Sequence, residues 1–229
     1  MKHIVIIVTI LFSITTFSQK LKKEDINDMI LIEGDSIEFS LDEVMLLKKL
    51  KLDNKKERNY YYWYRKKIHK AYPYAVTTAM TLAEVDKHLK RIKSKRKRKK
   101  YIKKAQKLLN EEFKQELKKM TRTEGRLLIR LIHRQTGLTT FDLIKKYRSG
   151  WKAFWYNSTA NMFRLSLKMK YKPETRDLDF LVEDILQRAF LNETLKETKS
   201  KLTFDYHELA AKHKNLDIVK LIDNRKKLK

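Results

Sequence analysis

The residue types that carry enzymatic chemistry are sparse and poorly spaced in this chain of 229 residues. It has no cysteine, which excludes thiolate nucleophiles, thiol redox chemistry and cysteine-ligated metal sites. His207 and His213 do not share one face of a helix, and the sequence has no His-Glu-x-x-His motif, glycine-rich phosphate loop or nucleophile elbow. Glu124 and His133 lie beyond the reach of one helical contact. We therefore expect no enzyme, and no catalytic, cofactor-binding or metal-ligating residues.

Cations are the chemistry that the sequence does supply. The formal net charge is +26, and residues 87–107 hold 13 Lys and Arg residues and no acid. Their centre is one unbroken run: Lys95, Arg96, Lys97, Arg98, Lys99 and Lys100. Such a run neutralises phosphates or binds acidic surfaces, although it is also typical of a helix face that is merely solvated. We favour an acidic protein partner or anionic surface, such as lipid head groups or lipopolysaccharide.

A second cationic pattern is a row of arginines at four-residue spacing: Arg122, Arg126, Arg130 and Arg134. On a helix these side chains share one face, and guanidinium forks suit bidentate contacts with carboxylate or phosphate. Arg126, Arg130 and Arg134 are therefore candidate interaction residues. The alternative, which we favour, is pairing with acids of a neighbouring helix, for instance Asp177, Asp179, Glu183 or Asp184.

Two aromatic clusters are candidates for a protein interface. The first is the run of residues 60–64, with Tyr60, Tyr61 and Trp63, and the second contains Trp151 and Trp155. Tyr and Trp are enriched at interfaces because they supply a large rigid area with a polar tip. Five consecutive aromatics cannot all face one core from a helix, so we expect some to be exposed. Core packing is the alternative.

The amino-terminal leader changes how these charges are interpreted. Residues 1–18 have a positive start at Lys2, an apolar stretch of about half the ~20 residues that span a bilayer, and a small-x-small ending at Ser18. This pattern predicts a cleavable secretory signal and a periplasmic location, with the periphery of the outer membrane as one option. Export removes nucleic acid as a partner. It also weakens a helix-turn-helix interpretation of residues 122–148.

The elements that must position these residues are mainly helical, because the chain has only four Gly and two Pro and its apolar residues recur at helical spacing. We expect a multi-helix bundle behind a small β-hairpin at residues 29–39, after which a polar linker spans 53–58. Helices are predicted over 59–93, with a break or kink at Pro73, and over 95–120, 122–135, 139–148, 151–171 and 177–198. Thr121 and Glu124 form a capping-box pattern, and Gly137 suits a helix end.

The expected organisation is a signal peptide at 1–18, an acidic segment with short strands at 19–58, a helical domain at 59–198 and a basic helical tail at 199–229. The acidic segment is distinctive because residues 24–47 hold eight acids and no base. The chain therefore has an acidic head and a basic middle. These can pair with each other or bind partners of either sign.

The block of residues 121–163, TRTEGRLLIRLIHRQTGLTTFDLIKKYRSGWKAFWYNSTANMF, resembles the signature of a family of exported bacterial proteins catalogued as a domain of unknown function. The segments Tyr72-Pro73-Tyr74-Ala75 and Tyr101-Ile102-Lys103-Lys104 also match, and the resemblance covers roughly residues 37–195. The departures are Ser149-Gly150, where the family tends to have Arg-Gly-Ser, and a longer tail. The resemblance implies a periplasmic protein, and a component of the type IX secretion apparatus within that class, but no catalytic residues.

Together these observations predict a non-enzymatic structural or adaptor protein of an envelope assembly. Its partners would be envelope or secretion-system proteins with acidic surfaces. The alternative is a basic periplasmic protein that binds anionic envelope polymers or lipids.

Overall fold

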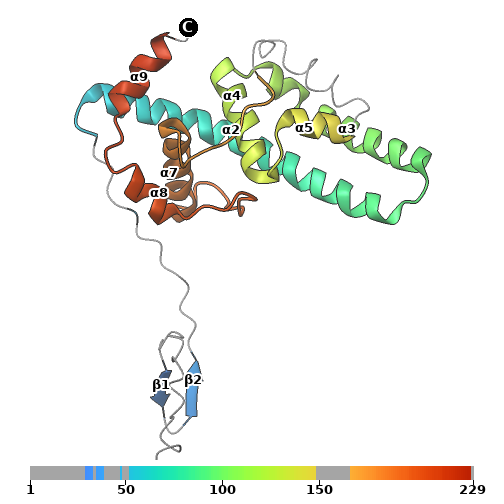
Figure 1. The fold of residues 1–229 in the computed structure, drawn as a ribbon, viewed down its shortest axis with the longest axis horizontal. Helices are drawn as coiled ribbons and strands as arrows, with labels where there is room; N and C mark the ends of the chain where they lie inside the picture. Colours follow the sequence, from blue (N-terminus) through green and yellow to red (C-terminus); the bar gives the residue numbers. More distant parts are fainter. Residues whose placement is uncertain (1–28, 33–34, 39–46, 48–51, 148–165, 228–229) are drawn as a thin grey trace, which may run out of the picture. The chain divides into compact units, whose positions relative to one another are not determined.

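The computed structural model describes residues 29–32, 35–38, 47, 52–147 and 166–227 (Figure 1). The chain divides into two compact units, residues 1–48 and 49–229. The predicted signal peptide and both Trp151 and Trp155 lie outside the described residues. The predicted tail, residues 199–229, lies within the second unit.

The first unit contains two short strands, β1 (Met29–Ile32) and β2 (Asp35–Glu38). They pair antiparallel with Met29 opposite Glu38 and Ile32 opposite Asp35. No side chain of either strand is described. The expected β-hairpin therefore gains no support from packing, and a folded β-element at the amino terminus stays a prediction.

The second unit begins with α2 (Lys55–Arg91), a helix of 37 residues and about 55 Å. Its first turn corrects the predicted linker over residues 53–58. The Asn54 side chain caps the helix by accepting the Glu57 N–H at 2.9 Å, and the Glu57 carboxylate accepts the Asp53 N–H at 2.9 Å. A polar stretch that looks like a linker is thus a capped helix start. Pro73 lies inside α2, which continues past it.

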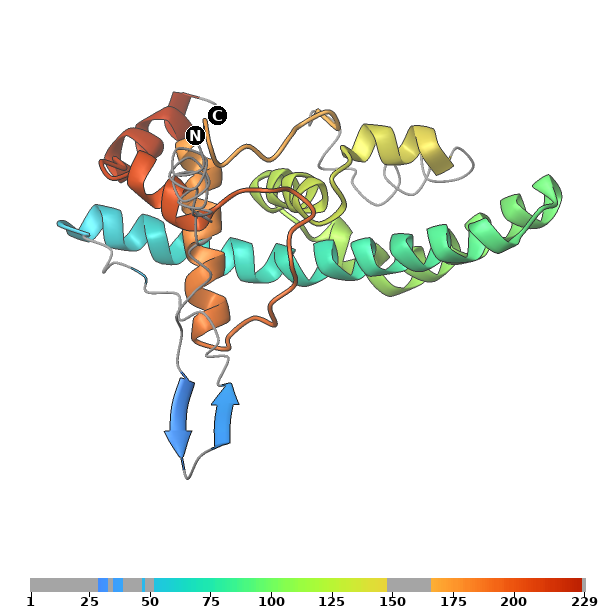
Figure 2. The same ribbon diagram turned by 60° about the horizontal axis from the view of Figure 1, so that its bottom comes forward.

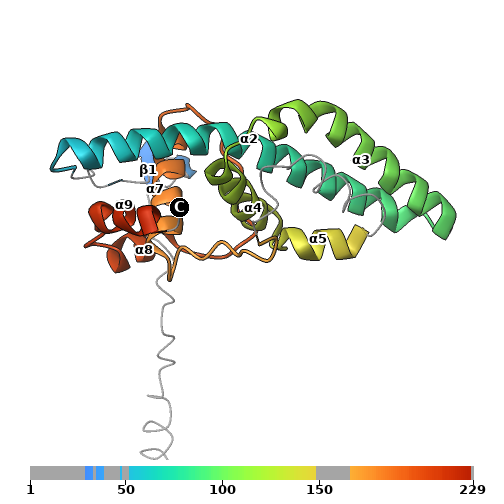
Figure 3. The same ribbon diagram turned by 90° about the horizontal axis from the view of Figure 1, so that it is seen from above.

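The next helix, α3 (Lys95–Lys118), follows the short connection at residues 92–94 and runs back beside α2 (Figures 2 and 3). Leu109, Phe113 and Leu117 form its buried stripe. The Phe113 ring and the Tyr74 ring of α2 pack in a T-shaped arrangement with centroids 5.0 Å apart. We call this antiparallel pair the α2–α3 hairpin. The predicted helix over 95–120 is confirmed to within two residues.

Two shorter helices follow, α4 (Arg122–Thr136) and α5 (Thr140–Tyr147). The predicted capping box is present: the Thr121 hydroxyl accepts the Glu124 N–H, and the Glu124 carboxylate accepts the Thr121 N–H at 2.6 Å. Gly137 ends α4 at a φ of 72°, in the left-handed region that favours glycine. Both sequence patterns are confirmed.

The remaining helices are α7 (Asp177–Leu191), α8 (Tyr206–Lys212) and α9 (Ile218–Lys227). The predicted helix over 177–198 is wrong at its end, because the chain turns at Asn192 and Glu193 has a positive φ of 53°. The predicted helix over 151–171 is wrong for residues 166–171, which are turn and irregular chain. The rest of that stretch lies outside the described residues.

The core lies where α2, α4 and α7 meet. Ile68, Leu131 and Leu181, one from each helix, are fully buried. The tail contributes as well, since Ile218 and Ile222 of α9 are buried in the same apolar cluster. The described part of the chain contains seven helices. The prediction of a mainly helical fold is therefore confirmed.

Candidate functional site

The arginine row on α4 meets the acids of α7. The Arg134 guanidinium donates two hydrogen bonds to Glu183, from Nε to Oε2 at 2.8 Å and from Nη2 to Oε1 at 2.7 Å. One turn earlier, Arg130 Nη1 donates to Asp179 Oδ1 at 3.0 Å. All four side chains are buried. Arg130 and Arg134 therefore form core ion pairs, and the favoured alternative, pairing with acids of a neighbouring helix, is what the structure shows.

Two further donors complete the Glu183 site. Tyr171 donates its hydroxyl hydrogen to Glu183 Oε2 at 2.7 Å, and Gln187 Nε2 donates to Oε1 at 2.9 Å. Burial alone would raise the pKa of Glu183, but Arg134 and these donors outweigh it and hold the pKa below its usual value. The carboxylate is therefore held in its charged form inside the core.

At Asp179 the effect of burial on the pKa outweighs the effect of the hydrogen-bond donors. Burial raises its pKa above the ordinary value even though Arg130 and the Lys172 N–H, at 3.1 Å from Oδ2, both favour the charged form. A buried ion pair repays the desolvation of its charges only when its geometry is good. The single hydrogen bond from Arg130 to Asp179 offsets less of the desolvation cost than the two hydrogen bonds between Arg134 and Glu183 do.

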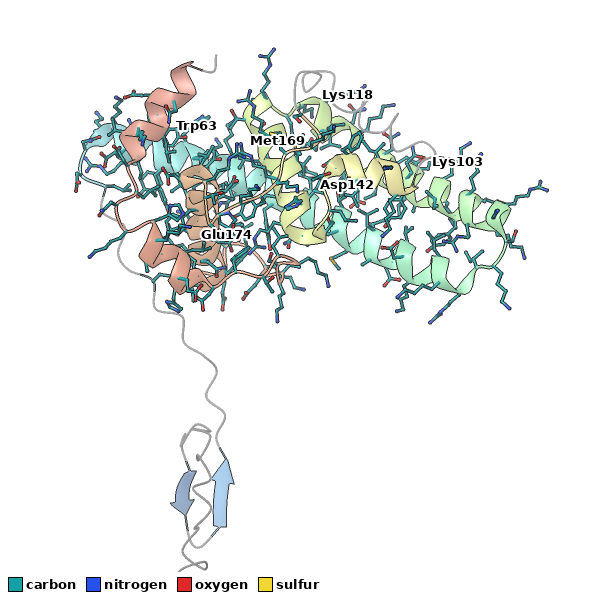
Figure 4. All side chains as sticks on the ribbon, viewed as in Figure 1. Trp63, Lys103, Lys118, Asp142, Met169 and Glu174 are labelled. Atoms are coloured by element: carbon teal, nitrogen blue, oxygen red, sulfur yellow. The ribbon has the colours of Figure 1, made fainter. Side chains whose placement is uncertain are left out.

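The aromatic run on α2 is mainly a core element. Tyr60 and Tyr61 have exposed fractions of 7% and 8%, so core packing, the alternative to an interface, describes these two candidates. The exposed member is Tyr62, at 58%, and Trp63 is half-buried (Figure 4). A helix turns 100° per residue, so neighbours in the run must face different directions.

Four of the candidate residues nevertheless meet at one pocket. Tyr60 and Trp63 of α2, with Arg126 and Arg130 of α4, line a cavity of about 230 Å³ together with Arg176. Leu127, Leu178 and Leu221 complete its apolar wall. We call it the aromatic–arginine pocket. It combines fixed positive charge with an apolar floor.

The basic run begins α3, and all six of its side chains are exposed. Ser94 caps the helix, and the first turn contains no acid. The positive end of the helix dipole therefore carries further positive charge, which costs stability locally. This arrangement is unfavourable for the isolated helix and favourable for binding an anion.

A groove of about 860 Å³ lies between this end of α3, the end of α2, and α5. Leu89, Ile102 and Tyr147 form its apolar surface. Asp86, the acid that lines it, already has two partners. Lys146 Nζ forms an ion pair with Oδ2 at 2.7 Å, and the Tyr147 hydroxyl donates a hydrogen bond to Oδ1 at 2.9 Å. Four other cations line the groove without an acidic partner among the described residues: Lys90, Lys95, Arg98 and Lys99. We call this region the basic groove.

A second concavity lies on another side of α3. Ile92 and Tyr101 form its apolar part, and five lysines surround them, including Lys103 (Figure 4): Lys97, Lys100, Lys103, Lys104 and Lys107. The α2–α3 hairpin therefore presents cations around most of α3 and has two hollows of different composition.

No sequence pattern pointed to four residues that have roles in the structure: Lys67, Asp86, Tyr171 and Arg176. Lys67 Nζ lies 2.9 Å from Glu124 Oε1 and joins the capping box to α2. Lys67, Asp86 and Tyr171 contact partners 12 or more positions away in the chain, so no local spacing could reveal them, whereas Arg176 lies three residues before Asp179. His133 does not pair with Glu124; its Nδ1 accepts the Tyr171 N–H at 3.2 Å.

Two features are absent from the described residues, 29–32, 35–38, 47, 52–147 and 166–227. No group of three or more acids and histidines there could hold a metal ion. No helix there is both long and apolar enough to cross a membrane.

Comparison with known proteins gives one match. A family model described as "Domain of unknown function (DUF4294)" matches residues 35–188. This match covers more than half of the chain. No curated protein and no solved structure matches it.

Proposed function

Because the chain belongs to the DUF4294 family, a domain of unknown function, we propose a function from its own surfaces: a non-enzymatic adaptor that docks an acidic protein through the basic groove. One observation carries the proposal. Four cations surround an apolar surface, and the acid in the same groove is already neutralised by Lys146. A partner with an acidic rim and an apolar centre would complement both features.

The stability cost of the basic run supports a binding role. Six exposed cations at the start of α3 oppose its dipole and repel one another. An anionic partner reverses both effects, because it meets the positive helix end and the side chains together. Binding of an anionic partner therefore stabilises the start of α3.

The location belongs to the same proposal. The leader pattern of residues 1–18 and the resemblance to exported proteins support a periplasmic adaptor in an envelope assembly. Within that class we propose a component of type IX secretion, similar to its periplasmic protein PorD. The resemblance in residues 121–163 supports this narrower assignment.

The second candidate function is binding of anionic lipid or lipopolysaccharide. The lysine-lined concavity favours it, because five ammonium groups surround an apolar patch formed by Ile92 and Tyr101. Flexible point charges over an apolar surface suit phosphate head groups with acyl chains beneath them. This candidate uses α3 and Ile92, which ends α2.

The test is mild crosslinking and purification from envelope extracts. In the test variant, residues 95–100 are all replaced by Gln. The matched control replaces six exposed lysines elsewhere, so that the change in net charge is identical: Lys196, Lys199, Lys201, Lys212, Lys214 and Lys220. We expect the test variant, and not the control, to lose defined envelope proteins. The loss should be larger at ~10 mM than at ~150 mM salt, because the Debye length falls from ~30 to ~8 Å.

Sedimentation with vesicles containing phosphatidylglycerol separates the two candidates. Protein recovery that depends on residues 95–100, with weak vesicle binding, supports the adaptor. Vesicle binding that is lost in the same variant, without specific protein recovery, supports the lipid function. Equal recovery by the test variant and its control would remove the basic run from the mechanism.

A further inference from the structure

The aromatic–arginine pocket is independent of the basic groove and is built by different elements. Tyr60 and Trp63 come from α2, Arg126 and Arg130 from α4, and Arg176 from the residue that precedes α7. These residues are far apart in the chain, and tertiary packing brings them together. The pocket therefore belongs to the folded core of the second unit rather than to one helix surface.

The pocket has more positive charge than the acids that contact it neutralise. Three arginines line it, and none of the described residues in its lining is an acid. Two of these arginines contact one acid, Asp179: Arg130 through Nη1 at 3.0 Å and Arg176 at 3.8 Å. One carboxylate thus faces two arginines, and Arg126 has no acidic partner among the described residues.

Arg130 provides a second, independent observation. Its side chain has an exposed fraction of only 10%, yet Nε has no hydrogen-bond partner among the described residues. Buried donors that lack an acceptor cost stability, so they are rare unless a ligand satisfies the group. The guanidinium uses Nη1 for Asp179, and Arg130 is among the residues that line the pocket.

Size and composition define the ligand. A volume of about 230 Å³ equals the space of about eight water molecules at ~30 Å³ each, which accommodates one residue-sized group. A floor of Trp63, Tyr60 and Leu127 favours an apolar or aromatic body over a bare inorganic ion. Guanidinium forks favour a planar carboxylate.

We propose that the aromatic–arginine pocket binds an apolar group that carries one carboxylate, the chemistry that a polypeptide presents at a carboxy-terminal Leu or Phe. The carboxylate lies between Arg126 and Arg130, with Arg176 closing one side. The apolar side chain packs on Trp63 and Leu127. Capture of a chain end in this way is a recurring mode of peptide recognition.

The experiment is calorimetric titration of the full chain with matched probes. N-acetyl-phenylalanine is compared with its amide, and the peptide acetyl-Ala-Ala-Ala-Phe with its carboxamide. We expect each acid to bind about tenfold more tightly than its amide, because a charge-assisted bond is lost in the amide. Binding by the peptide acid identifies a chain end as the source. Binding by the single amino acid alone identifies a small free acid and overturns the chain-end assignment.

Matched arginine variants locate the site. Arg126→Gln and Arg176→Gln are expected to weaken acid binding about tenfold, whereas Arg122→Gln, one turn away on α4 and exposed, leaves it unchanged. Thermal unfolding of each variant checks that the fold is intact; Arg130 is left in place because it neutralises buried Asp179. Equal affinity for acid and amide, or no binding at about 10 mM probe, overturns the proposal. Equal losses in the Arg122 and Arg126 variants overturn it as well.

Discussion

Arg134 and Glu183 form a fully buried, two-bond ion pair between α4 and α7, with donor–acceptor distances of 2.8 and 2.7 Å. The same arginine reaches the Thr198 carbonyl through Nη1 at 3.4 Å, and the Lys201 N–H donates to the Arg134 carbonyl at 3.0 Å. The pair therefore joins two core helices and the chain that follows α7. It fixes the face that α4 turns toward the core.

Glu183→Gln should destabilise the fold by about 3–5 kcal/mol, because it leaves the Arg134 charge buried without a counter-charge. The double variant Arg134→Met with Glu183→Met removes both charges, and we expect it to cost less than the single change. Urea unfolding measures both. Glu197→Gln, at an exposed carboxylate, is the control and should change stability by less than about 0.5 kcal/mol. A double variant that is less stable than the single one would contradict the role of the pair.

Glu124 gives a prediction about pH. Burial alone would raise its pKa, but bonds from the Thr121 N–H and hydroxyl and from Lys67 outweigh this and lower the pKa below 4.5. A group whose pKa is lowered by folding stabilises the native state above its unfolded pKa, and this contribution is lost as pH falls through the folded value.

The measurement compares the free energy of unfolding of the wild type with that of Glu124→Gln between pH 3 and 7. We expect the wild type to be more stable by about 1 kcal/mol at pH 7, with the difference constant down to pH 4.5 and shrinking below it. Glu174→Gln, at an exposed carboxylate with no ion pair among the described residues, should show little difference throughout. A difference that grows as the solution is acidified would contradict the assigned direction.

Lys97→Glu should stabilise α3 while weakening the binding of an acidic partner. Lys97 lies three residues after the cap Ser94, and its N–H reaches the Ser94 hydroxyl at 3.5 Å. A glutamate there completes a capping box and complements the helix dipole, which together contribute about 0.5–1 kcal/mol. Thermal unfolding measures the gain, and recovery of crosslinked partners measures the loss.

Lys104→Glu is the matched control for this trade-off, because it makes the same charge change at an exposed position in the interior of α3. We expect it to leave stability within about 0.5 kcal/mol. Equal stabilisation by the two variants would show that relief of overall charge repulsion, rather than the helix start, is responsible.

Local patterns predicted local structure well. The capping box at Thr121 and Glu124, the left-handed Gly137 and the α3 boundaries all depend on residues within one or two turns of each other. The start of α2 was missed although its signal is equally local. Asn54 and Glu57 form a cap, and the charged residues around them resemble a linker.

Candidate residues were harder to assign because their roles depend on distant partners. The arginine row was visible, and pairing with α7 acids was the favoured outcome, but which arginines pair depends on how α4 crosses α7. Arg130 and Arg134 pair with Asp179 and Glu183, whereas Arg126 lines the aromatic–arginine pocket. The exposure of Tyr62 and the burial of Tyr60 likewise depend on the helices that cover α2.

By itself, the sequence determined the helical class, the helix caps and a dense positive charge that no nearby acid can neutralise. These follow from periodicity, short-range hydrogen bonds and composition. Only the tertiary structure decided which charges remain available. Packing neutralises Arg134 and Asp86, and it leaves the cations of the basic groove exposed. The physical reason is that burial and pairing depend on contacts between residues 49 or more positions apart.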